Sequence, residues 1–98
     1  MCEFKILLEK EDKKEKIAED IIKISYEDDV LSLYDVLGSR KPVENAIILK
    51  VDVGSEEVVV IEHPLIKDFI KLIRCAKDRD LIELWQKFKV KGDNLFLK

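Results

Sequence analysis

Apolar and charged residues alternate at the start of the chain, in the run Glu3-Phe4-Lys5-Ile6-Leu7-Leu8-Glu9. A period of two is typical of a β-strand that buries one face. The one exception, Leu7, indicates that the second face is partly covered. The pattern therefore predicts a strand over residues 3–8.

The next segment repeats its apolar residues at the spacing of a helix. These residues fall on one helical stripe: Ile17, Ala18, Ile21, Ile22 and Ile24. Asp12 followed by Glu15 has the spacing of a capping box, with Asp in place of the usual Ser or Thr. Together these features predict a helix over residues 13–24.

The segment from Asp28 to Gly38 fits two interpretations. As a helix, it has an Asp at its N-cap, an apolar face, and Gly38 just after its last turn. As a strand, its leucines face one way and Tyr34 and Val36 the other, but the alternation breaks in the middle. The helix is preferred for that reason, and the strand remains the alternative.

Two apolar runs, residues 45–53 and 57–62, are separated by Gly54-Ser55, which suits a tight hairpin turn with glycine at its first central position. The second run is apolar on both faces and should lie inside the sheet, whereas the charges in the first suit an edge. With a two-residue loop, the opposed pairs would be Val51 with Val58, Leu49 with Val60, and Asp52 with Glu57.

The C-terminal third predicts more helix. Pro64 suits the first turn of a helix over residues 64–76, which has a broad apolar arc. A second, shorter helix would begin near Asp78 or Asp80 and carry Leu81, Ile82, Leu84 and Trp85. The tail, residues 88–97, would close the fold as a hairpin around Gly92-Asp93.

This order is close to the βαββαβ order of a ferredoxin-like fold. We therefore expect an α+β protein with an antiparallel sheet of four to five strands and paired helices, mainly on one face of the sheet. At 98 residues the chain has the size of one domain. A single α+β domain over residues 1–98 is the expectation.

Composition narrows the choice of partners. Hydrophobic residues make up 47% and charged residues 40%, which excludes a disordered chain. Abundant Lys, Glu and Ile, with no Thr, resemble proteins that work at high temperature. The net charge of −3 mixes both signs along the chain, so nucleic acid and membranes are not expected partners. With no signal peptide or membrane span, the expected location is the cytoplasm.

The sequence contains few residues that suggest an enzyme. His63 is the only histidine, and no glycine-rich phosphate loop or hydrolase motif is present. His63 would cap or pack at the helix that follows it. Cys2 and Cys75 lack metal-ligand spacing, and Cys75 lies near a helix C-terminus, where the helix dipole opposes a thiolate. No catalytic residue and no cofactor are predicted.

Asp52 and Glu57 form the one local conflict in the sequence, because carboxylates directly opposed across two strands repel each other. A bound divalent cation would relieve the repulsion, and a solvated hairpin tip would reduce it. A cation-binding protein or small enzyme using these two carboxylates, with His63 nearby at a subunit boundary, is therefore the alternative function.

The leading hypothesis is a small non-enzymatic interaction or regulatory domain. In the predicted register, one sheet face holds the core, and the opposite face keeps an apolar patch with a charged rim. Such a patch suggests a homodimer, or contact with another protein, through the sheet. The expected interface residues are Leu7, Ile48, Val59 and Ile61.

Overall fold

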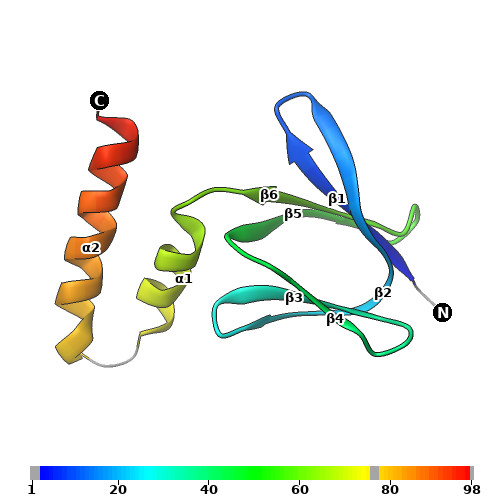
Figure 1. The fold of residues 1–98 in the computed structure, drawn as a ribbon, viewed down its shortest axis with the longest axis horizontal. Helices are drawn as coiled ribbons and strands as arrows, with labels where there is room; N and C mark the ends of the chain where they lie inside the picture. Colours follow the sequence, from blue (N-terminus) through cyan, green and yellow to red (C-terminus); the bar gives the residue numbers. More distant parts are fainter. Residues whose placement is uncertain (1–2, 76–77, 98) are drawn as a thin grey trace.

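The computed structural model describes residues 3–75 and 78–97, in which six strands precede two helices (Figure 1). The strands are β1 (Phe4–Lys10), β2 (Lys13–Glu27), β3 (Val30–Asp35), β4 (Arg40–Val43), β5 (Ala46–Asp52) and β6 (Glu57–Glu62). The helices are α1 (Ile66–Arg74) and α2 (Asp78–Phe96).

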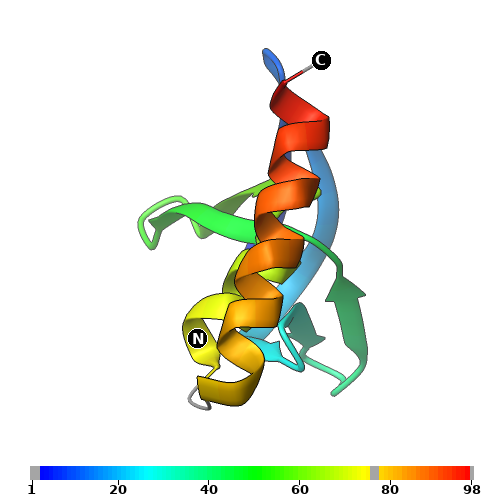
Figure 2. The same ribbon diagram turned by 90° about the vertical axis from the view of Figure 1, so that its left-hand side faces the viewer.

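All six strands form one mixed, curled sheet in the order β4-β3-β2-β1-β6-β5. Neighbours pair antiparallel except β1 and β6, which are parallel. Figure 1 shows α1 beside the sheet and α2 on the far side of α1, and Figure 2 shows the long α2 from that side. The α+β class is confirmed, but the ferredoxin-like order with four to five antiparallel strands is wrong.

The predicted helix over residues 13–24 is instead the long strand β2. Glu11 and Asp12 form the turn between Lys10 and Lys13, and Glu11 has a positive φ of 52°. Asp20 also has a positive φ, of 57°, and the pairing of β2 shifts at several points. Each irregularity inserts an extra residue into the strand and breaks the period of two. The isoleucines of β2 are therefore spaced as they would be in a helix.

Residues 30–35 follow the strand interpretation of the segment between Asp28 and Gly38. Asp28 and Asp29 form a two-residue turn that joins β2 to β3, with φ of 52° and 64°. Two consecutive positive φ values match the twist of the flanking strands, and Asp tolerates that conformation. Gly38, with φ of 85°, lies in the next turn rather than after a helix.

The hairpin of β5 and β6 confirms the predicted pair of runs, and its loop is four residues long, Val53 to Glu56. Near the loop the register is as predicted, with Val51 opposite Val58 and Asp52 opposite Glu57. The register then shifts by one residue at Leu49, so that Ile48 rather than Leu49 faces Val60. A shift of one residue exchanges the two faces of a strand.

The helix predicted over residues 64–76 is confirmed as α1. The second helix is longer than predicted, because α2 continues through the expected closing hairpin at Gly92-Asp93. A Cβ placed on Gly92 would stand 4.0 Å from Leu65 Cδ1, so this glycine lies at a helix contact rather than in a turn. Lys91 Nζ and Asp68 Oδ2, 2.7 Å apart, also join the two helices.

The hydrophobic core belongs to the sheet. Its buried cluster consists of Ile6, Leu8, Ile21, Leu31, Leu33, Val43, Ala46, Val58 and Val60. None of the described side chains of α1 or α2 is buried. Tyr26 ties β2 to β5 across the curl: its hydroxyl donates to the Ala46 carbonyl at 3.2 Å and accepts from the Ile48 N–H at 3.3 Å.

Candidate functional site

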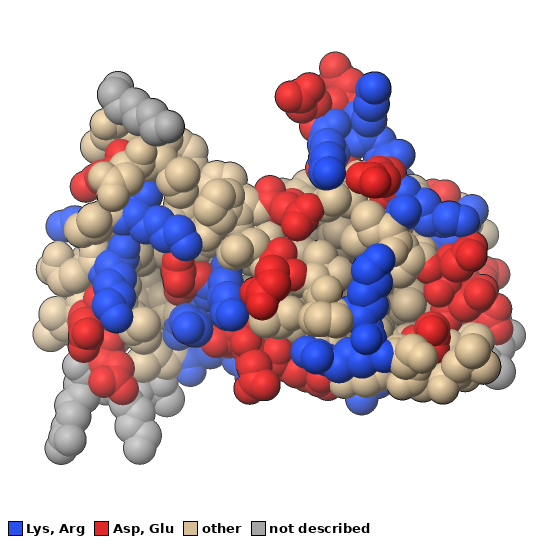
Figure 3. Space-filling view, in the orientation of Figure 1, with Lys and Arg blue, Asp and Glu red and all other residues tan. Residues whose placement is uncertain are grey.

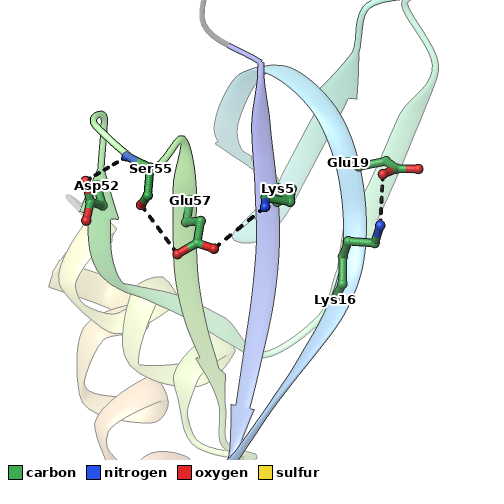
Figure 4. A network of polar contacts seen from close by, with 6 residues as sticks. All are labelled: Lys5, Lys16, Glu19, Asp52, Ser55 and Glu57. Atoms are coloured by element: carbon green, nitrogen blue, oxygen red, sulfur yellow. Dashed lines mark hydrogen bonds and ion pairs between the residues drawn. The ribbon is translucent and has the colours of Figure 1, made fainter.

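The tip of the hairpin formed by β5 and β6 brings the two predicted carboxylates together (Figure 4). Asp52 Oδ1 accepts a hydrogen bond from the Ser55 N–H at 3.1 Å, and the Ser55 hydroxyl lies 3.4 Å from Glu57 Oε1. Lys5, on the neighbouring strand β1, has its Nζ 3.8 Å from Glu57 Oε2. Each carboxylate thus has a polar partner within the chain.

These contacts stabilise the charged form of Asp52. Hydrogen bonds from Ser55 lower the pKa of the Asp52 carboxyl, and the positive charge of Lys50 lowers it further. Within residues 3–75 and 78–97, no group of three or more His, Cys, Asp and Glu side chains could hold a metal ion. Cation binding at Asp52 and Glu57 stays a prediction.

His63 lies between β6 and α1 and acts at the start of the helix, as predicted. Its Nδ1 accepts a hydrogen bond from the Leu65 N–H at 3.1 Å, and its ring stacks on Phe96 with centroids 5.6 Å apart. Asn45 Oδ1 accepts from the Lys67 N–H at 2.9 Å, which satisfies a second donor at that helix end. His63 therefore orients the helical pair on the sheet.

The four predicted interface residues do not form an open patch in the chain. Val59 is only 2% exposed, and the other three are half-buried. Ile48 packs against the core, because the register shift at Leu49 turns it toward Val60. The expected exposure of this face is thus corrected, and the participation of Leu7, Ile48, Val59 and Ile61 in a contact between copies stays a prediction.

A row of exposed apolar side chains lies instead along β5 and its loop. Leu49 and Val51 are each 55% exposed and Val53 is 61% exposed. Leu49 and Val51 lie on the edge strand β5 and Val53 begins its loop, with charged Lys50 and Asp52 between them. The alternation of apolar and charged residues was the available signal for this surface, and the shift at Leu49 affects the place of Leu49 alone among the three.

The helical pair carries a second exposed apolar surface. Phe69 of α1 and Trp85 of α2 are 44% and 45% exposed, and both contact Phe88, with ring centroids 5.9 Å and 6.1 Å apart. Ile73 extends this surface toward the end of α1. Lys87 and Lys91 of α2 form ion pairs with Glu83 and Asp68.

A polar cleft of about 350 Å³ separates the turn between β2 and β3 from the helices. It is lined by Asp28, Asp29, Lys71, Arg74, Cys75 and Leu84. Arg74 reaches across it, with its Nη1 3.7 Å from Asp29 Oδ1. This ion pair joins α1 to the turn between β2 and β3.

Charges of both signs are interspersed over the face shown in Figure 3, and they crowd the projecting hairpin of β1 and β2. Of the described helices, neither has the length and apolar character required to cross a bilayer.

The fold and these surfaces define a small α+β protein built on one curled mixed sheet. The sequence pattern of the CO dehydrogenase accessory protein CooT family matches residues 1–61, and the chain belongs to that family. No curated protein matches the chain.

Among solved structures, the chain is similar to a crystal structure from Carboxydothermus hydrogenoformans that is provisionally described as CooT. The two are 24% identical with a TM-score of 0.58, and the match covers 63% of this chain and 98% of that one. At this identity the likeness shows the fold alone. The family match ends at residue 61, and both helices lie after it.

Proposed function

We propose that this protein is a non-enzymatic accessory protein that acts by binding directly to CO dehydrogenase. The family match over residues 1–61 carries this proposal, because it includes five complete strands and all but the last residue of β6. The structure agrees with a role in binding: its exposed apolar side chains lie on a sheet edge and on a helical pair, where partners can reach them.

The test is a binding measurement with purified CO dehydrogenase from the same organism, combined with CO dehydrogenase activity in cells that lack this protein. We expect saturable binding and reduced activity of the enzyme. A matched pair of fragments locates the contact: residues 1–64 should bind like the full chain, and residues 63–98 should not. Absence of binding together with unchanged activity would refute the proposal.

Self-association through the sheet is the second part of the proposal. The exposed apolar side chains at the β5 edge support it, since contiguous apolar surface is commonly a contact between proteins. Sedimentation velocity over a range of protein concentrations measures it directly. A mass that stays that of one chain at every concentration would remove this part and leave the CO dehydrogenase proposal standing.

Divalent-cation binding at the hairpin tip is the second candidate function. The direct opposition of Asp52 and Glu57 across β5 and β6 favours it. A cation that binds the native state must raise the melting temperature, so a thermal-shift series with divalent metals tests it. The expected response is lost in Asp52→Asn, and an equal response in that variant would place the cation elsewhere.

A further inference from the structure

A small pocket of about 230 Å³ opens where β2 runs past the end of β3. Strand β3 ends at Asp35, opposite Ile21, and does not pair with the preceding part of β2. The floor of the pocket is apolar and consists of Ile17, Ala18, Ile21 and Leu33. Ile21 and Leu33 are 3% and 0% exposed and belong to the buried cluster, so the pocket reaches the core.

The backbone of β2 is irregular along this pocket. Ile17 is an extra residue in the pairing of β2 with β1. Asp20 has its positive φ of 57°, and its carbonyl accepts a hydrogen bond from the Val36 N–H at 3.0 Å. A bulge bends its strand, and bulges are frequent beside binding and active sites. In this chain the irregular part of β2 forms one wall of the pocket.

The two carboxylates at the rim of the pocket, those of Glu19 and Asp35, have partners within the chain. Lys16 Nζ lies 2.9 Å from Glu19 Oε2, as Figure 4 shows. Asp35 Oδ1 accepts hydrogen bonds from two backbone N–H groups of the turn that follows β3, each at 2.9 Å. Both acidic side chains are therefore satisfied without a ligand.

Lys41 is the cation at the rim whose charge is not matched. Its Nζ donates to the Ile17 carbonyl across the pocket, and among the residues that the structure describes it forms no ion pair. Arg40 also lines the pocket, but its Nε donates to Ser32 Oγ at 3.0 Å and lies 3.5 Å from Glu27 Oε1. One unmatched cation above an apolar floor fits a monoanion that is joined to an apolar group.

We propose that this pocket binds a small apolar carboxylate, with the apolar group on the floor and the carboxylate on Lys41 Nζ. A cavity of roughly 150 Å³ holds benzene, so the pocket has room for one branched aliphatic or aromatic group. An ammonium group has three donors, so Lys41 can contact the ligand and keep its bond to Ile17. A charge-assisted hydrogen bond to the ligand is stronger than one between neutral groups.

The same chemistry has two sources, a free carboxylic acid and the C-terminal residue of another protein chain. In both, a carboxylate lies close to an apolar group. Binding in this pocket goes beyond the proposed function and requires neither CO dehydrogenase nor self-association. It can therefore be tested on the purified chain alone.

An NMR titration of the full chain with 4-methylpentanoate tests the inference. Saturable shifts are expected in the amide signals of residues 17–21 and 33–41. Acetate lacks the apolar group and 4-methylpentanamide lacks the charge, so each should bind ~10-fold or more weakly. A tripeptide that ends in leucine, with a free or an amidated C-terminus, separates the two sources. Tighter binding of the free peptide assigns the pocket to a protein C-terminus, and tighter binding of 4-methylpentanoate assigns it to a free acid.

Variants locate the contacts. Lys41→Gln should weaken binding of 4-methylpentanoate ~10-fold and leave that of 4-methylpentanamide unchanged. Lys14→Gln, at the exposed hairpin of β1 and β2, makes the same change in net charge and should have no effect. Ala18→Leu fills the floor and should abolish binding, with circular dichroism as the check of folding. If that variant does not fold, Lys41→Gln and the ligand series still decide.

Three results would overturn the inference. The first is the absence of saturable shifts at millimolar 4-methylpentanoate. The second is equal binding of the acid and its amide, which would mean that the pocket does not recognise the carboxylate. The third is equal weakening in Lys41→Gln and Lys14→Gln, which would mean that net charge rather than Lys41 attracts the ligand.

Discussion

The sheet and the helical pair are stabilised by different means. The sheet holds every residue of the buried core cluster, whereas α1 and α2 bury none of their described side chains. The charges differ as well. Residues 1–62 contain 9 basic and 16 acidic residues, a net −7, and residues 63–98 contain 9 basic and 5 acidic residues, a net +4. Opposite net charges let the two parts attract each other with little apolar burial between them.

The contacts between the two parts follow that charge difference. Lys67 lies 3.4 Å from Glu44, and Arg74 lies 3.7 Å from Asp29, so in both ion pairs α1 supplies the cation and the sheet the anion. All four side chains are partly exposed, and exposed pairs contribute little and are screened by salt. We infer that the helical pair detaches before the sheet unfolds. The sheet alone then determines the fold.

The largest expected effect comes from separating the two regions. A chain that ends after Pro64 should keep its β-sheet and unfold cooperatively, because it retains the whole core. The isolated segment 63–98 should be largely unfolded, because most of the stability of a protein helix comes from tertiary packing and this segment has no core. Circular dichroism and amide NMR spectra of both fragments check this. A sheet that unfolds without the helices would instead establish residues 1–98 as one inseparable domain.

An isoleucine in each region allows the stability contributions of the sheet and the helical pair to be compared directly. Ile6 is fully buried in the sheet, and Ile73 of α1 is 63% exposed. Ile6→Ala should lower the free energy of unfolding by ~2–5 kcal/mol through the cavity that it leaves. Ile73→Ala should change it by no more than ~0.5 kcal/mol. Equal losses in urea denaturation would mean that the helical pair shares the core.

Sequence reasoning succeeded where local patterns were regular. The strand at residues 3–8, the hairpin of β5 and β6 and the helix α1 follow the expected periodicities. It failed where a strand is irregular: Asp20, with its positive φ, gives β2 the spacing of a helix, and the shift at Leu49 exchanges the faces of β5. Such irregularities depend on pairing with distant strands, which the local pattern does not encode.

At the candidate site, too, the sequence predicted only what depends on local pattern. The opposition of Asp52 and Glu57 followed from the turn alone and was predicted correctly. The place of Leu49 could not be predicted, because the register shifts at that residue, whereas Val51 keeps its predicted partner Val58 and is nevertheless exposed. The C-terminal tail was misjudged for another reason: Gly92-Asp93 is a strong turn signal, yet the surrounding residues of α2 pair with α1 and keep it helical.

A smaller effect is expected where Asn45 caps α1. Its side chain accepts from the Lys67 N–H, and its φ of 53° is one that glycine also adopts. Asn45→Gly should therefore remove this hydrogen bond without backbone strain and cost ~1 kcal/mol. Asn45→Asp keeps the acceptor and should cost less. Hydrogen exchange should rise in α1 and stay unchanged in the sheet; a rise in both would contradict the independence of the two regions.

The smallest effect is the pH dependence that Tyr26 gives to the sheet. Burial raises the pKa of the Tyr26 hydroxyl above its ordinary value of about 10. The folded state then holds this proton more tightly than the unfolded state. The resulting stability is present below about pH 10, and it is lost as the pH rises toward the raised pKa.

Tyr26→Phe isolates that contribution, because it removes the ionisable group together with its hydrogen bonds to Ala46 and Ile48. Near pH 8 the variant should be less stable by ~1 kcal/mol. The difference from wild type, measured by urea denaturation, should shrink as the pH rises above about 10, because the unfolded wild type ionises there first. A difference that stays constant as the pH rises above about 10 would mean that folding does not raise the pKa of this hydroxyl.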